Sequence, residues 1–197
     1  MELAIFPLNG AVLFPGTSLP LNIFENRYIE MINYALARNR QIGMIQTNEN
    51  GQLYSVGCIG KIHSFSETSD GRYLISLQGV NCFKLNKELK NDYSFRIINA
   101  TLISNSDKDN FFSNNQKITL LKKYEDYVKT KKINLNLKEI ETIEISQIIK
   151  FIAMISPFKN IDKQALLETR SLLEFYDKLM SIIELELVGN LSSNTMN

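Results

Sequence analysis

The sequence has few of the residues that most often carry catalysis, metal binding or a disulfide framework. Its 197 residues include one histidine, two cysteines, four prolines and no tryptophan. A metal site around His63 would need carboxylate or thiol ligands, and none stands at a suitable spacing. We therefore expect His63 to be an ordinary strand residue, and we predict neither a metal nor a cofactor.

An excess of charge of one sign is also missing. The formal net charge is +1, because 22 Lys and Arg residues nearly balance 21 Asp and Glu residues. Residues 1–104 hold nine basic and eight acidic residues, and residues 105–197 hold thirteen of each. A protein that follows a phosphate backbone usually concentrates cations on one face. A nucleic-acid partner is therefore not expected.

Long apolar runs and export features are absent as well. No apolar run approaches the roughly 20 residues that a membrane-spanning helix needs, and the opening MELAIFPLNG does not resemble an export signal. Cys58 and Cys82 lie in apolar, strand-like contexts without a CxxC motif. They are expected to be buried reduced thiols, with a disulfide or redox pair as the alternative. Together these features predict a cytoplasmic protein without a membrane partner.

The residues that are present predict a folded α+β protein, with strands first and helices afterwards. Hydrophobic residues make up 44% of the chain, which is ordinary for a globular protein. We expect a β-rich subdomain over residues 1–104, a polar linker over 105–116, a helical subdomain over 117–189 and a frayed tail over 190–197.

Within the first subdomain, runs of apolar or alternating residues predict strands, and Arg27–Arg38 has the apolar spacing of a helix. Pro20 cannot donate to a ladder, so its strand should lie at an edge or a bulge. Gly57 and Gly60 indicate bulges or close backbone approach. The expected strands cover residues 3–6, 11–14, 18–23, 42–46, 55–65, 72–77, 80–85 and 93–103, with Gly79 separating the sixth from the seventh.

The second subdomain is expected to contain four helices. Apolar residues at helical spacing mark residues 118–128, 140–155 and 172–187, and a short helix should begin at Asp162. Ser156-Pro157 is expected to end the second helix, and Gly189 the fourth. Bundle core is the simplest use of the isoleucines of residues 140–155, and a partner groove or dimer seam is the alternative.

One dense motif carries a family resemblance. Residues 6–31 read FPLNGAVLFPGTSLPLNIFENRYIEM. This segment resembles the opening of the Lon protease N-terminal (substrate-binding) domain family, roughly FPLxxxVLFPG followed by LPLxIFExRY. Further agreement lies at 43–44, 56–62, 70–73, 77–80 and 162–168. After Val80 the family usually has Arg-Phe, whereas this chain has Asn81-Cys82-Phe83, which removes one cation.

The resemblance implies a fold and identifies the residues that should build it. The fold is a PUA-like β pseudo-barrel with one inserted helix, followed by a C-terminal helical bundle. Phe14, Phe24 and Tyr28 should join the inserted helix to the sheet, each contributing about 1.5–3 kcal/mol if fully buried. The residues expected to act as structural motif positions are Pro15, Gly16, Tyr28, Gly57, Gly60, Gly71 and Gly79.

The resemblance also implies a non-catalytic, stand-alone module that binds proteins. The chain lacks the GxxxxGK[ST] loop and the Ser–Lys peptidase motif of a Lon protease, so we predict no enzymatic activity and no catalytic residues. Expected partners are unfolded or degron-bearing proteins, a Lon-type protease and a second copy in a weak homodimer. An RNA-binding PUA-like protein is the alternative, followed by an unrecognised hydrolase.

The candidate protein-binding residues fall in two places. Phe24, Glu25 and Arg27 flank the predicted strand-to-helix junction, where Glu25 and Arg27 could equally form a structural ion pair or a helix cap. Phe111 and Phe112 are two aromatic residues in an otherwise polar linker. They should contact a partner or the opposite subdomain, or else pin the linker to the core.

Overall fold

The computed structural model describes residues 1–104, 112–135 and 139–194, with side chains as far as residue 189. The chain forms two compact units. The first, here called the β unit, contains Met1–Ser104 together with Ser156–Glu168. The second, the helical unit, contains Asn105–Ile155 and Thr169–Asn197. Residues 117–189 were expected to form one helical subdomain, whereas Ser156–Glu168 packs with the β unit.

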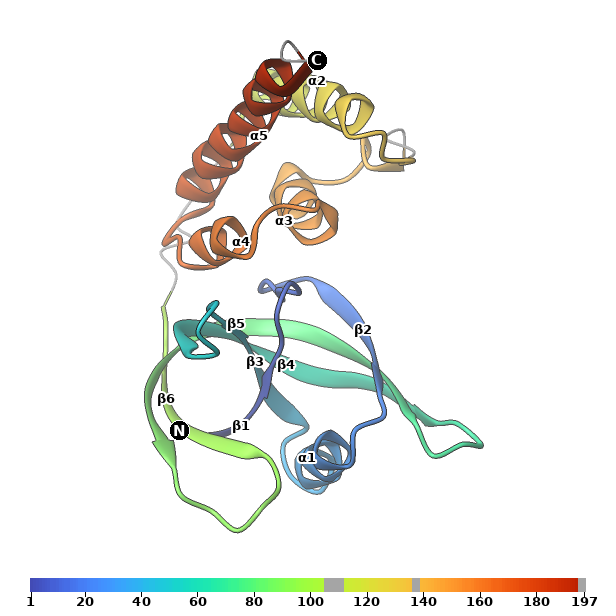
Figure 1. Ribbon diagram of the computed structural model, residues 1–197, viewed down its shortest axis with the longest axis vertical. Coiled ribbons are helices and arrows are strands. Elements are labelled where there is room, and N and C mark those ends of the chain that lie inside the picture. Colours follow the sequence, from blue (N-terminus) through green and yellow to red (C-terminus); the bar gives the residue numbers. More distant parts are fainter. Residues whose placement is uncertain (105–111, 136–138, 195–197) are drawn as a thin grey trace. The chain divides into compact units, whose positions relative to one another are not determined.

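The β unit is a six-stranded mixed sheet in the order β2-β5-β4-β3-β1-β6. An additional pairing of β5 with β6 closes five of the strands into a barrel (Figure 1). The β1–β3 pairing is parallel and the others are antiparallel. The strands are β1 Glu2–Pro7, β2 Ser18–Ile23, β3 Gln41–Thr47, β4 Leu53–Glu67, β5 Tyr73–Leu89 and β6 Arg96–Leu102.

Strand β2 lies at the open edge of this sheet. Among the described residues it pairs only with β5, from Ser18 opposite Gln78 to Ile23 opposite Tyr73. The edge position predicted from Pro20 is therefore confirmed.

The expected strand at residues 11–14 and the expected break at Gly79 were both wrong, and β6 begins at Arg96 rather than at Tyr93. Residues 11–14 form a buried loop, and residues 72–77 and 80–85 belong to the single strand β5. The amide of Gly79 donates to the Thr17 carbonyl at 2.8 Å, and its carbonyl accepts from Gly16 at 2.9 Å. A Cβ atom on Gly79 would meet the Phe14 carbonyl oxygen. Because Gly79 has no side chain, the loop of residues 11–17 can cross β5 at this position while the strand continues. A bulge between Ile59 and Gly60 of β4 shifts the register of the β4–β5 pairing.

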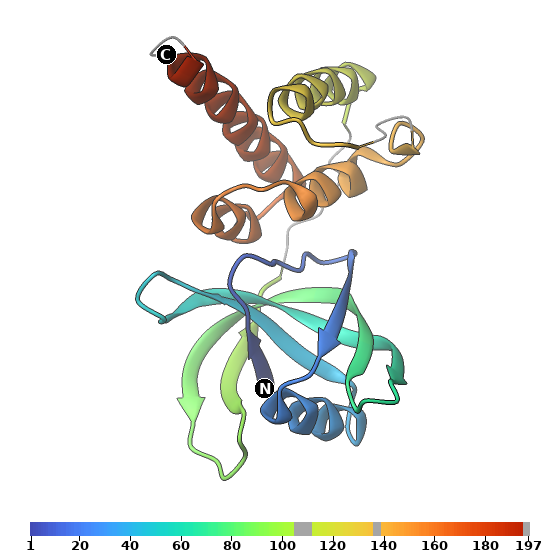
Figure 2. The ribbon, with the colours of Figure 1, turned by 45° about the vertical axis from the view of Figure 1, so that its right-hand side comes forward.

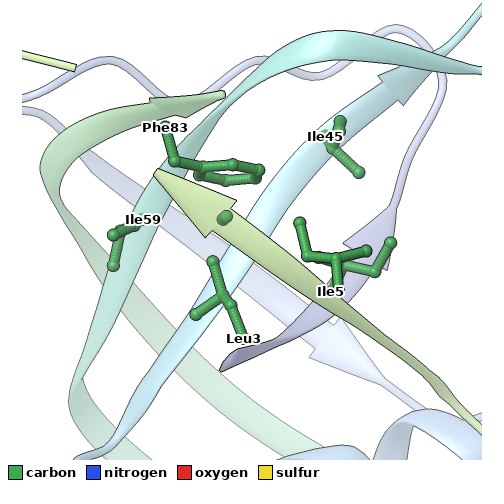
Figure 3. Packing of buried hydrophobic residues seen from close by; sticks show 7 residues of the cluster. Leu3, Ile5, Ile45, Ile59 and Phe83 are labelled. Atoms are coloured by element: carbon green, nitrogen blue, oxygen red, sulfur yellow. The ribbon is translucent and has the colours of Figure 1, made fainter. Parts of the chain in front are cut away.

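The barrel interior is filled by apolar side chains from five strands (Figure 3). Phe83 is fully buried at its centre, and Gly43 and Gly57 make room for the ring. A Cβ atom on Gly57 would lie 2.5 Å from Phe83 Cζ, closer than packed atoms tolerate. The buried cluster consists of Leu3, Ile5, Ile45, Ile59, Phe83, Ile98 and Ala100.

Helix α1 (Asn26–Leu36) is inserted between β2 and β3 and packs against β1 and β3 (Figure 2). Its buried residues Tyr28, Met31, Ile32 and Ala35 have the spacing that the sequence predicts. The Tyr28 ring meets Phe6 of β1 edge-on, with centroids 4.4 Å apart.

The helical unit contains α2 (Asn114–Thr130), α3 (Ile145–Ile155) and α5 (Leu172–Asn194), and both α2 and α3 pack against α5. Helix α2 begins with a capping box between Ser113 and Gln116. Helix α3 begins at Ile145, later than predicted, so Ile140 is buried ahead of it. Helix α5 does not end at Gly189 but continues to Asn194, and residues 195–197 of the expected frayed tail lie outside the described residues.

Candidate functional site

The junction between β2 and α1 places a large aromatic side chain on the surface. Phe24 follows the buried Ile23 and is 66% exposed. Phe14 and Tyr28 are buried as expected. Phe24 does not join the helix to the sheet, however, so that part of the expectation was wrong. A phenyl ring left in water at a fixed position is available for apolar contact with another molecule.

Next to Phe24, Glu25 and Arg27 form an ion pair. Arg27 Nε donates to Glu25 Oε2 at 2.9 Å, and a second guanidinium nitrogen lies 2.7 Å from the same oxygen. Glu25 is the N-cap residue of α1, but its side chain makes no capping hydrogen bond. The structure therefore contains the predicted ion pair and not the predicted side-chain cap. Because both groups are about half exposed, the pair contributes at most about 1 kcal/mol to stability.

The guanidinium group of Arg27 also lies over the ring of Tyr28. The guanidinium carbon lies 4.5 Å from the ring centroid, which is a cation–π distance. Burial raises the pKa of Tyr28, and the charge of Arg27 opposes that rise. Arg27 is thus held between a carboxylate and an aromatic face.

The strand register brings further exposed apolar residues to the same end of the sheet. Ile23 pairs with Tyr73, which in turn pairs with Glu67 of β4. Close to these positions, Phe65 is 38% exposed and Leu74 is 44% exposed. The two project from opposite faces of the sheet, because Phe65 pairs with Ile75, the residue next to Leu74 along β5. We call Phe24, Phe65 and Leu74 the β2 corner.

The hairpin that carries this corner is held firmly in place. The Phe65 ring packs edge-on against Tyr73, with centroids 4.9 Å apart. The Tyr73 hydroxyl donates to Asn33 Oδ1 of α1 at 3.2 Å. These contacts hold the β4–β5 hairpin, which carries Phe65 and Leu74, against α1, whereas Phe24 lies in the short connection between β2 and α1.

The outer edge of β2 borders this corner. Because β2 pairs only with β5 among the described residues, its other side presents strand backbone that an extended segment could pair with. Pro20 lacks an N–H, which limits how far such pairing could run. The β2 corner therefore combines apolar side chains with a short length of unpaired strand edge.

Phe112, of the second pair of candidate residues, lies in the helical unit. The Phe112 ring packs against Tyr176 of α5, with centroids 5.6 Å apart. The Tyr176 hydroxyl donates to the Gln116 carbonyl at 3.0 Å, and burial raises its pKa. Phe111 lies outside the described residues. The Phe112 contact favours the interpretation in which this aromatic residue pins the linker to the helical core.

Sequence reasoning did not identify the polar contacts that attach helix α4 (Asn160–Leu167) to the β unit. Gln164 Nε2 donates to the Val56 carbonyl at 3.1 Å and to Glu168 Oε1 at 2.8 Å. Gln46 Nε2 donates to Gln164 Oε1 at 3.1 Å and to the Asn160 carbonyl at 3.2 Å. Both glutamines are almost completely buried. The sequence carries one signal for these contacts. A glutamine stands at position 46 in the mainly apolar strand β3, and another at position 164 in the segment KQALLE.

The neighbouring Lys163 is buried against the loop that follows β1. Its Nζ donates to the Gly10 carbonyl at 3.4 Å, and desolvation lowers the pKa of Lys163. The side-chain amide of Asn160 also donates to Asn9 Oδ1. The matching segment 162–168 therefore serves to dock α4, which is a structural role.

Two surface cavities accompany these elements, one in each unit. The first measures about 410 Å³ and is lined by Asn48, Asn50 and Tyr54 near the β3–β4 turn and by Lys159 and Asn160 at the start of α4. The second measures about 580 Å³ and is lined by residues of both charges, including Lys122, Lys129, Lys132, Glu125 and Glu141. Most of the residues that line each cavity are polar or charged.

The part of the chain that the structure describes contains no group of three or more His, Cys, Asp or Glu side chains placed to hold a metal ion. Within the same residues, no helix is both long and apolar enough to cross a membrane.

Comparison with known proteins yields one family. Residues 2–184 match the model of the ATP-dependent protease La (LON) substrate-binding domain. The chain is similar to the Lon protease of Buchnera aphidicola subsp. Acyrthosiphon pisum, with 28% identity over 200 residues that cover 95% of this chain and 25% of that protein. It is also similar to the Lon protease of Brevibacillus choshinensis, with 23% identity over 94% of this chain and 25% of that protein. The chain thus spans about a quarter of the length of these relatives.

Solved structures show the same fold. A Lon N-terminal domain protein from Xanthomonas campestris superposes with a TM-score of 0.69 at 17% identity, covering 92% of this chain and 98% of that one. The N-terminal domain of the Mycobacterium avium complex Lon protease gives 0.62 at 16% identity, covering 93% and 98%.

Proposed function

The chain belongs to the Lon substrate-binding domain family, and on that premise we propose that its residues form a non-catalytic module that binds unfolded or degron-bearing proteins. The single observation that carries the proposal beyond the family is the exposed Phe24, mounted beside the open edge of β2. An unfolded chain offers what this site can use, namely extended backbone and apolar side chains.

In this proposal the client lies along the β2 corner in an extended conformation. Part of its backbone pairs with β2 as far as Pro20 allows. Its apolar side chains contact Phe24 and the exposed side chains on the two faces of the β4–β5 hairpin, Phe65 on one face and Leu74 on the other. Arg27, held by Glu25 and Tyr28, supplies a fixed donor at the rim. Three exposed side chains make a small contact, so each site should bind weakly and without strict sequence preference.

The alternative, RNA binding on a PUA-like sheet, receives little support from the charges. Arg27 and Arg96 of the β unit are paired with Glu25 and Glu88. In the helical unit, Lys129 pairs with Glu125 at 2.6 Å and Lys131 pairs with Glu186 at 2.6 Å. Cations neutralised in this way attract a polyanion less than an unpaired stripe would.

The proposal assigns no chemistry to these residues, because the sequence carries neither a phosphate-binding loop nor a Ser–Lys peptidase motif. Its partners are unfolded or degron-bearing proteins, together with a Lon-type protease and a second copy of the chain in a weak dimer. The cytoplasm suits such clients, and buried thiols suit its reducing conditions.

Replacing Phe24 by serine tests the proposed site. We expect the affinity for a permanently unfolded model protein to fall about five- to thirtyfold, since the loss of one anchoring aromatic contact is worth about 1–2 kcal/mol. Fluorescence anisotropy with a labelled, reduced model protein measures the effect. The melting temperature should stay nearly unchanged, because the ring is already exposed.

Leu102→Ser is the matched control for this experiment. Leu102 is 51% exposed at the end of β6, outside the β2 corner, so its loss removes apolar surface elsewhere on the same unit. Equal weakening by Phe24→Ser and Leu102→Ser would show that the protein binds through general surface hydrophobicity, and the β2 corner would lose its role.

A further inference from the structure

The two cysteines of the chain stand directly opposite each other on neighbouring antiparallel strands. Cys58 of β4 is the register partner of Cys82 of β5. Residues that face each other across an antiparallel pair project from the same side of the sheet. Both side chains are buried, with exposures of 0% and 4%.

The hydrogen-bond pattern shows which kind of pair they form. The amide of Ile103 donates to the Cys82 carbonyl at 2.9 Å, so the backbone polar groups of Cys82 point away from β4. Cys58 and Cys82 therefore form a non-hydrogen-bonded pair. In such pairs the Cα atoms lie about 4.5 Å apart and the side chains are closest. That spacing falls within the range of about 4.4–6.8 Å that a disulfide accepts.

Helix α4 packs beside this pair. Cys82 Sγ lies 3.9 Å from the Leu167 carbonyl oxygen, at the end of the helix. Gln164, one turn earlier, donates to the carbonyl of Val56, two residues before Cys58. Because both cysteines are buried and α4 packs beside them, we expect a reagent in solution to reach the sulfur atoms when α4 lifts from the sheet.

We propose that Cys58 and Cys82 are a reversible oxidation site that forms a cross-strand disulfide, and that α4 controls access to it. The oxidant is a small-molecule disulfide. One cysteine thiolate attacks it, forming a mixed disulfide and releasing one small thiol. The second thiolate then attacks the protein-side sulfur of the mixed disulfide and releases the second small thiol. Two protein S–H bonds are replaced by one S–S bond, and the small disulfide takes up two electrons and both protons.

The register gives this second step an advantage over competing reactions. Because the resolving thiol is already opposite the first, ring closure needs no movement of the strands. The end product should therefore be the intramolecular disulfide, rather than a stable mixed disulfide or a cross-linked dimer. The bond would join β4 and β5 covalently beneath α4 and raise the melting temperature by several degrees.

The test incubates the folded protein with oxidised glutathione in buffer. Differential alkylation and peptide mass spectrometry follow the two thiols. We expect a monomer lighter by the mass of two hydrogen atoms, with the Cys58 and Cys82 peptides joined and the product reversed by dithiothreitol. Cys58→Ser should stop at a mixed disulfide on Cys82.

Loosening α4 tests the gate. Gln164→Ala removes the bonds to Val56 and Glu168 and the bond from Gln46, and should speed oxidation about tenfold or more, because three hydrogen bonds of a buried side chain are lost. Gln46→Met removes the bonds to Asn160 and Gln164 from the other side and serves if Gln164→Ala fails to fold. Gln147→Ala, at an exposed position of α3, is the matched control and should oxidise at the wild-type rate.

Three results would overturn the proposal. The first is folded protein that does not oxidise, and the second is an end product that is a mixed disulfide or a dimer. Either would show that the pair is only a buried packing element. The third is an equal oxidation rate in wild type, Gln164→Ala and Gln46→Met, which would show that α4 is not the gate.

Discussion

Some positions in the barrel require glycine, because the absence of a Cβ atom leaves room for a neighbouring side chain. Gly57 faces Phe83 and the Met44 carbonyl so closely that a methyl group at this position would meet both at 2.5 Å. The sequence alone predicts close approach at Gly57, because a glycine interrupts an otherwise apolar strand. It does not identify Phe83 as the neighbour, since that contact depends on how distant strands pair. The exposure of Phe24 was missed for the same reason.

Gly57→Ala should lower the free energy of unfolding by about 2–3 kcal/mol, because the added methyl group overpacks a core that cannot yield. Urea titration followed by circular dichroism measures the change. Gly189→Ala is the control, since it lies on α5 with open space around it and should be neutral or stabilising by up to about 1 kcal/mol. Equal and small effects of the two substitutions would contradict the packing described here.

The Glu88–Arg96 pair between β5 and β6 predicts a small loss of folding stability at acidic pH. Two hydrogen bonds of 2.8 and 2.6 Å from Arg96 hold the pKa of Glu88 below its ordinary value of 4.5. A carboxylate with a lowered pKa stabilises the fold above its unfolded-state pKa, and that contribution disappears as the pH falls through the lowered value.

Wild type should therefore exceed Glu88→Gln in unfolding free energy at pH 7 by less than about 1 kcal/mol, since the pair is half exposed. The difference should shrink as the pH falls below 4.5. Urea titrations at several pH values measure it, and in an Arg96→Gln background it should be absent throughout. If the difference in unfolding free energy between wild type and Glu88→Gln instead grew as the pH fell, the lowered pKa of Glu88 would be refuted.

The helices and strands differ in how far the local sequence determines them. Helices α1 and α2 follow from apolar spacing, and the edge position of β2 follows from Pro20, because those signals act within a few residues. The continuity of β5 through Gly79 depends on a loop more than sixty positions earlier. The attachment of α4 to the β unit depends on Gln164 meeting Val56, 108 positions away in the chain. Such long-range pairings leave little trace in local periodicity.

Substitution of Phe112 tests how the segment before helix α2 is attached to helix α5. Phe112→Ser should lower the stability of the helical unit by about 1–2 kcal/mol, because a half-buried ring leaves Tyr176. It should leave client binding unchanged. Thermal unfolding and the anisotropy assay measure the two effects. Unchanged stability combined with weaker binding would instead make Phe112 a partner contact.

At the scale of the whole molecule, the protein combines a known fold with a near-neutral charge. The family match over residues 2–184 and the structural neighbours establish the architecture. The resemblance of residues 6–31 was enough to predict it, because that motif builds β2, the crossing loop and the start of α1. Those residues say less about clients, since only Phe24 among their large apolar side chains is well exposed.

The salt dependence of client binding tests the central claim most directly. Binding of a labelled, permanently unfolded protein of low net charge should be measured by anisotropy at about 50 and 200 mM salt, with a single-stranded RNA of equal label as comparison. Apolar capture at the β2 corner predicts that the affinity for the unfolded protein changes less than about threefold and exceeds that for RNA. An affinity that collapses about a hundredfold or more over this range, or tighter binding of the RNA, would contradict it.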